Sequence, residues 1–327
     1  MNKQATPNCH LEDAWNTLQA LRAEIGKAVI GQQSVVDQVL VALVAAGHVL
    51  IEGVPGLGKT LLAQALAKCI RGKFARIQFT ADLMPSDISG HAIYNLRSER
   101  FDIRYGPVFC HLLLADEINR APAKTQAALL EVMQEGQVTI EGQPFPLEPP
   151  FMVLATQNPI ELEGTYPLPE AQLDRFLLKI RIDYPDPGEE VALVRSVTLG
   201  QVGDKLDVSR LQPLLEPAAI LALQAVAANL AMDEQVLQYA VRIVVASRDF
   251  PGIAVGASPR GSIALVRAAR AQALLNGRDF VTPDDVKGIA GAILRHRLIL
   301  ATAFEMEGRS VDTVIGDLLS RVEAPRL

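Results

Sequence analysis

The chain has 327 residues, 49% of them hydrophobic, and its 31 lysines and arginines against 37 aspartates and glutamates give a net charge of −6. This length and apolar content suffice for two domains with buried cores. The acidic balance disfavours sequence-independent nucleic-acid binding, which requires cations to neutralise phosphates. Three separated cysteines (Cys9, Cys69 and Cys110) without a CxxC pair, and five unclustered histidines, argue against a disulfide framework and a transition-metal site.

The sequence predicts no targeting or membrane-spanning segment. Residues 1–13 are polar and lack the apolar centre of a signal peptide. The longest apolar run, residues 39–47, is too short to cross a bilayer. We therefore expect a soluble, cytoplasmic protein with no membrane span.

Two helical patterns, residues 11–25 and 35–46, precede the first predicted strand. The turn between them, residues 29–34, contains Ile30 and Gly31. Ahead of a phosphate-binding loop, such a turn can close over an adenine, with Ile30 supplying apolar contact and Gly31 allowing close backbone approach. Ordinary packing of a turn is the alternative.

The strongest chemical signal is the segment GVPGLGKT at residues 53–60, between the apolar run 49–51 and a helical pattern. Backbone N–H groups of such a glycine loop surround a polyphosphate, and the helix N-terminus adds positive potential. Lys59 is expected to reach the β- and γ-phosphates of ATP, and the Thr60 hydroxyl to hold Mg²⁺. A turn that merely joins a strand to a helix is the alternative. The candidate nucleotide-binding residues here are Val54, Pro55, Gly56, Leu57, Gly58, Lys59, Thr60 and Leu61.

Two hairpins are predicted around the following strands. Phe101, Ile103 and Tyr105 alternate with charged residues, which indicates a hairpin at about 93–106. A second, proline-rich hairpin is expected at about 137–150. A minimal nucleotide-binding fold needs neither, so each either faces a partner or is structural decoration.

The apolar run 111–115 predicts a buried parallel strand that ends in Asp116 and Glu117. Open α/β sheets bind ligands at this end of their strands. Asp116 fits an Mg²⁺-associated role, directly or through water, and Glu117 fits the base that orients and polarises the attacking water. A strand that ends in a solvated acidic turn is the alternative. After another buried run, Asn158 is placed to hold that water, although a turn residue before proline is equally ordinary.

A fifth strand is predicted at 177–182, and the Pro- and Gly-rich residues 184–188 then end all strand periodicity. We expect an α/β nucleotide-binding domain over 1–185 and an all-α domain over 186–327. Ser258 and Thr282 each precede a proline as helix caps. Arg260 follows in a first helical turn, where a cation opposes the helix dipole. It is a candidate phosphate sensor, with a surface salt bridge as the alternative.

The chain resembles the MoxR family of AAA+ ATPases over nearly its whole length. The stretches that carry the likeness are GVPGLGKT, LLLADEINR, LATQNP, GTYPLPEAQLDRF and GASPR. The resemblance implies a parallel sheet of order 5-1-4-3-2 with helices on both faces, then an all-α lid, with the nucleotide between them. It also implies that Asn158 is a first sensor, Arg260 a second sensor, and Arg175 an arginine finger acting on a neighbour's nucleotide.

The same resemblance implies an ATP-hydrolysing ring, most simply a hexamer, that remodels or activates protein clients. Such clients include metal-containing enzyme complexes, and partners include von Willebrand factor A domain proteins. Two alternatives stay open. Arg97, Arg100 and Arg104 would suit a nucleic-acid motor, although acidic residues interrupt them. A nucleotide-dependent scaffold without turnover is the other, and Glu117 argues against it because binding alone needs no base.

Overall fold

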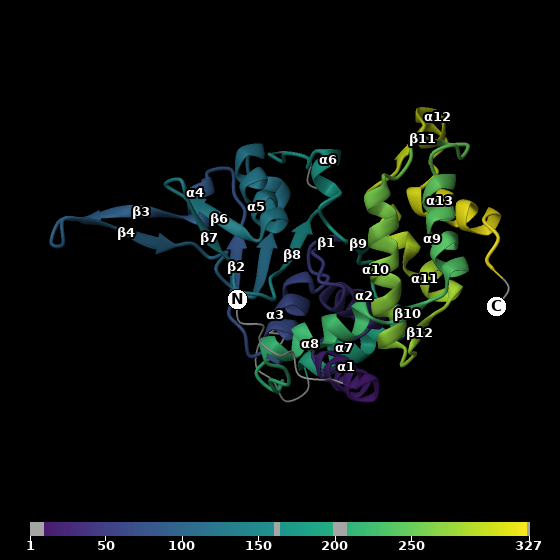
Figure 1. Cartoon of the computed structure of the whole chain (residues 1–327), viewed down its shortest axis with the longest axis horizontal. Helices are drawn as coiled ribbons and strands as arrows, with labels where there is room; N and C mark the ends of the chain where they lie inside the picture. Colours follow the sequence, from purple (N-terminus) through teal and green to yellow (C-terminus); the bar gives the residue numbers. More distant parts are fainter. Residues whose placement is uncertain (1–9, 160–163, 199–207, 326–327) are drawn as a thin grey trace.

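A five-stranded parallel sheet forms the centre of the computed structural model, which describes residues 10–159, 164–198 and 208–325 (Figure 1). Its order is β2-β5-β8-β1-β9. Numbered along the chain within the sheet, this is the order 5-1-4-3-2 that the resemblance implied. The strands are β1 (Val49–Glu52), β2 (Phe74–Gln78), β5 (Leu112–Asp116), β8 (Met152–Gln157) and β9 (Leu178–Arg181).

Helices cover both faces of the sheet, because the apolar strands send alternate side chains to two buried clusters. Ile51 and Leu114 join the cluster that contains α1, α2 and α3. Their neighbours Leu50 and Leu113 join the cluster that contains α5. The predicted α/β class is therefore confirmed. The helices are α1 (Leu11–Gly26), α2 (Gln33–Val44), α3 (Lys59–Cys69) and α5 (Ala123–Glu135).

Two antiparallel hairpins extend the sheet domain. The first pairs β3 (Gly90–Asn95) with β4 (Arg100–Tyr105), follows the short helix α4 (Pro85–Ser89), and reaches far from the sheet (Figure 1). It begins at residue 90, before the expected 93, because Gly90 still pairs with Tyr105. The second pairs β6 (Gln137–Ile140) with β7 (Gln143–Pro146).

The C-terminal region is helical, as expected, with two additions. Strands β10 (Ala231–Met232) and β12 (Phe280–Val281) pair, as do β11 (Ile253–Val255) and β13 (Ile299–Leu300). Strands of two or three residues are too short to show alternation, so the sequence predicted only helices. None of the described helices is long and apolar enough to span a membrane. The remaining helices are η1 (Ile118–Arg120), α6 (Glu170–Leu173), α7 (Pro187–Thr198), α8 (Pro217–Ala228), α9 (Glu234–Ala246), α10 (Pro259–Leu275), α11 (Pro283–Leu294), α12 (Thr302–Met306) and α13 (Val311–Arg321).

Buried polar contacts fix this helical region to the sheet domain beside β9. The guanidinium of Arg297, just after α11, is 4% exposed and donates from Nε to Asp174 Oδ1 at 2.7 Å. It also donates to the carbonyl oxygens of Phe176 and Leu177, at 2.7 and 3.2 Å. We call this set of contacts the Arg297 clasp. It holds the segment that carries Arg175.

A buried histidine, His48, joins β1, β8 and α5. Its Nδ1 accepts from the Val153 N–H at 3.0 Å, and its Nε2 donates to the Met133 carbonyl at 3.2 Å. Both ring nitrogens are used by the neutral imidazole. Burial, which disfavours the charged form, lowers the pKa of His48 from 6.5 to about 4.

This lowered pKa predicts acid sensitivity. His48 binds a proton less readily in the folded protein than in the unfolded chain. The contribution of His48 to the free energy of unfolding is therefore complete above pH 6.5. The contribution falls by about 3 kcal/mol as the pH drops toward 4. Urea unfolding between pH 7.5 and 4.5 checks this. The slope against pH should be smaller by one proton in His48→Phe than in the wild type, and equal slopes would contradict the assignment.

Candidate functional site

The glycine loop between β1 and α3 has the backbone that a phosphate-binding loop needs. Gly56 and Gly58 have φ of +86° and +77°, in the left-handed region that favours glycine, and Gly58 caps α3. A cavity of about 600 Å³ lies at the carboxyl ends of the neighbouring strands. Its lining residues are Pro55, Gly56, Gly58, Lys59, Thr60, Leu61, Gln64, Arg76, Gln78, Asp116, Glu117 and Asn158.

Four predicted residues lie beside this cavity rather than in its lining. The side chains of Val54 and Leu57 pack against the core, so only their backbone is available to a ligand. The Leu57 carbonyl accepts from Gln32 Nε2 at 2.8 Å, which ties the turn that contains Ile30 and Gly31 to the loop. The turn predicted to contact adenine therefore lies next to the predicted phosphate-binding loop.

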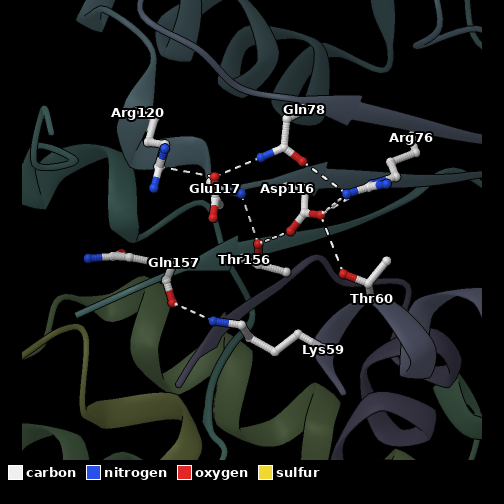
Figure 2. Close-up of polar contacts among 9 residues, drawn as sticks. All are labelled: Lys59, Thr60, Arg76, Gln78, Asp116, Glu117, Arg120, Thr156 and Gln157. Carbon is white, nitrogen blue, oxygen red and sulfur yellow. Dashed lines mark hydrogen bonds and ion pairs between the residues drawn. The ribbon is translucent and has the colours of Figure 1, made fainter. Parts of the chain in front are cut away.

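The Asp116 carboxylate is buried at the end of β5 and uses both oxygens (Figure 2). Oδ1 accepts from the Thr156 hydroxyl at 2.6 Å, and Thr156 Oγ1 itself accepts from the Glu117 N–H at 2.8 Å. Oδ2 lies 3.4 Å from Thr60 Oγ1 and 2.7 Å from Arg76 Nη2. The hydroxyl and the carboxylate are hard oxygen ligands, so the donor set fits Mg²⁺.

Glu117 follows in the left-handed region, with φ of +55°. Its Oε2 accepts from Gln78 Nε2 at 2.7 Å and lies 3.0 Å from Arg120 Nε (Figure 2). Asn158 is buried and lines the same cavity. The structure thus brings the predicted base and the predicted first sensor to one cavity.

The lysine of the glycine loop also points into the site. Lys59 Nζ donates to the Gly53 carbonyl. It also donates, at 3.3 Å, to the Gln157 carbonyl (Figure 2). These carbonyl oxygens hold the ammonium group between β1 and β8. A triphosphate in the cavity would offer the ammonium group stronger, charged acceptors.

Sequence reasoning missed Arg76, Gln78, Arg120 and Thr156. Gln78 and Thr156 lie at the carboxyl ends of strands that neighbour β5, Arg76 lies in the middle of β2, and Arg120 lies on the short helix after β5. For Gln78 and Thr156 the usable signal was their position in the strands, because polar residues at the carboxyl ends of adjacent parallel strands meet at one edge. Residue identity alone does not show which of them touch.

The predicted arginine finger and second sensor lie elsewhere. Arg175 and Arg260 line a different cavity, of about 290 Å³, together with Asp174, Arg267 and Arg297. Among the described residues, none after 158 lines the cavity at the glycine loop. Within one chain, the structure brings the two arginines to each other and not to the phosphate loop. Four arginines against one aspartate make the second cavity attractive to anions.

Comparisons with known proteins agree with this geometry. Residues 48–178 match the ATPase family associated with various cellular activities (AAA), and residues 245–318 match the AAA lid domain. The chain is 46% identical to Chaperone MoxR1 of Mycobacterium tuberculosis, over 95% of this chain and 83% of that protein. It is 32% identical to Protein MoxR of Methylorubrum extorquens, over 99% of this chain and 100% of that protein. A crystal structure from Cytophaga hutchinsonii is 41% identical, with a TM-score of 0.87 over 97% of both chains.

A glycine loop, an acidic pair at the end of the adjacent strand and a helical lid together define an AAA+ ATPase that binds nucleotide. The two MoxR relatives, matched over most of their length, narrow this class. The chain belongs to the MoxR family.

Proposed function

We propose that this protein is a cytoplasmic, Mg²⁺-dependent ATPase whose subunits share catalytic sites in a ring, most simply a hexamer, and that hydrolysis serves to remodel protein clients. The main support for the proposal is that the predicted catalytic residues lie in two separate cavities of one chain. The glycine loop, Asp116, Glu117 and Asn158 line one cavity, and Arg175 and Arg260 line another.

The first cavity contains the groups that hydrolysis needs. Backbone N–H groups of the loop and Lys59 would bind the triphosphate, and Thr60 with Asp116 would hold Mg²⁺. The bound ion would neutralise charge on the phosphates. Glu117 orients a water molecule and accepts its proton, while Asn158 holds that water in line. The oxygen–phosphorus bond to ADP breaks as the water oxygen bonds to the γ-phosphorus.

The second cavity supplies the cations that the first one lacks. Arg175 and Arg260 would reach the nucleotide of a neighbouring copy, with Arg175 as finger and Arg260 as second sensor. Charge develops on the γ-phosphoryl oxygens in the transition state, so a guanidinium there lowers the barrier. An isolated subunit should bind nucleotide yet hydrolyse it slowly.

The first hairpin offers a surface for a protein client. Tyr94 and Phe101 face each other across its strands, with ring centroids 5.2 Å apart. Phe101 is 71% exposed and Leu96 at the tip is 83% exposed. Exposed aromatic residues are typical of binding surfaces. The name of the relative Chaperone MoxR1 agrees with a protein client. The wider resemblance suggests metalloenzyme complexes and von Willebrand factor A domain proteins as clients and partners.

The function is tested by the ATPase rate per subunit, measured against protein concentration with Mg²⁺ and with EDTA. A rate that rises with concentration and disappears with EDTA supports a metal-dependent, shared site. A permanently unfolded protein, such as reduced and carboxymethylated lactalbumin, should stimulate the rate, and duplex or single-stranded DNA should not. Stimulation by DNA alone would instead support the nucleic-acid motor.

Replacing the exposed apolar residues of the hairpin should separate client binding from hydrolysis. In the variant Leu96→Ser with Phe101→Ser, we expect the unfolded protein to bind about tenfold more weakly, as when an interface anchor is removed. The basal ATPase rate should stay the same. Met306→Ser is the matched control, because Met306 is 84% exposed on α12. Equal losses in both variants would argue against the hairpin.

A further inference from the structure

Arg76, on the edge strand β2, makes contacts that link the metal ligand to the base (Figure 2). Its Nη2 and Nε lie 2.7 and 3.2 Å from the same oxygen, Asp116 Oδ2. Nη2 also donates to Gln78 Oε1 at 3.0 Å, and Gln78 Nε2 donates to Glu117 Oε2 at 2.7 Å. A continuous chain of hydrogen bonds therefore runs from Asp116 to Glu117.

The Arg76 guanidinium donates hydrogen bonds to Asp116 Oδ2, the carboxylate oxygen that faces the proposed metal site. Thr60, the other proposed magnesium ligand, lies 3.4 Å from Oδ2, whereas Oδ1 is engaged by Thr156. A magnesium ion held between Thr60 and Asp116 would therefore have to share Oδ2 with the guanidinium. The Arg76 side chain is 46% exposed and lines the cavity, so it has room to leave.

We infer that Arg76 is a positioning residue that competes with Mg²⁺ for Asp116. The inference rests on the proposed function. Gln78 Oε1, which accepts from Arg76 Nη2 at 3.0 Å, helps to hold the guanidinium on Asp116. A metal ion at Oδ2 would therefore have to displace the guanidinium before it could bind there.

The main test measures metal binding without hydrolysis. A fluorescent ADP analogue is titrated with Mg²⁺ in wild type, Arg76→Met and Arg76→Lys, and the Mg²⁺ midpoint is read from the fluorescence. In Arg76→Met the midpoint should fall about two- to fivefold, the size expected when a partly exposed ion pair is removed. Arg76→Lys keeps a cation beside Asp116, so its midpoint should stay near the wild-type value. Circular dichroism confirms that the variants are folded.

An unchanged or raised midpoint in Arg76→Met would overturn the inference. Weaker ADP binding by Arg76→Met in EDTA would also overturn it, because Arg76 would then be a phosphate ligand. These binding results do not depend on turnover, so they separate failure of the inference from failure of the proposed ATPase.

Discussion

Replacing Glu117 by glutamine should leave nucleotide binding intact and reduce hydrolysis about 10²- to 10⁴-fold, the usual contribution of a general base. The amide has the same shape as the carboxylate, so Gln78 retains an acceptor, but the amide cannot take the proton of water. Titration with a fluorescent ATP analogue measures binding, and single-turnover hydrolysis measures the chemical step.

A matched control for this variant is Glu131→Gln, an exposed position on α5 outside the cavity. It should behave as the wild type in both measurements. Unchanged turnover in Glu117→Gln would refute the assignment of the base. It would also make the alternative of a binding scaffold irrelevant, because turnover would proceed without Glu117.

Replacing Arg175 by alanine should reduce the ATPase rate of the assembled protein about 10³- to 10⁵-fold, as for other arginine fingers. Nucleotide binding should change little, because Arg175 lies outside the cavity at the glycine loop. Steady-state ATPase assays at high protein concentration measure the loss. Arg195→Ala, an exposed arginine of α7, is the control.

Mixing two inactive variants decides whether the finger acts between subunits. Arg175→Ala retains Glu117, and Glu117→Gln retains Arg175. In mixed rings, the intact Arg175 of one subunit would meet the intact Glu117 of the next, so part of the activity should return. A mixture that stays inactive, or a rate that is indifferent to Arg175, would mean that each subunit acts alone.

Sequence patterns predicted the sheet, the glycine loop and the acidic pair because each is encoded locally. The loop needs glycines and a lysine at fixed spacing, and each buried strand is a short apolar run that ends in a polar residue. Asp116 and Glu117 could therefore be assigned from residues within one strand and its flank. The order of the strands came with the family resemblance.

The partners of the acidic pair could not be predicted, because they depend on register between strands. Gln78 pairs with Asp116 across β2 and β5, and Thr156 comes from β8 on the other side. A single-sequence pattern does not fix these neighbours. Likewise, the place of Arg260 depends on how the C-terminal helices pack against a segment far earlier in the chain, where Arg297 meets Asp174, 123 residues before it.

The Arg297 clasp bears on how the helical region can move. Removing one partner from a buried ion pair costs about 3–5 kcal/mol. If opening the clasp costs a similar amount, detached molecules make up less than about 1% of the population at any moment. The C-terminal helices, the segment that carries Arg175 and the sheet domain beside it then move as one rigid body. Rotation of a whole subunit, without a hinge inside it, would then advance or withdraw the Arg175 guanidinium.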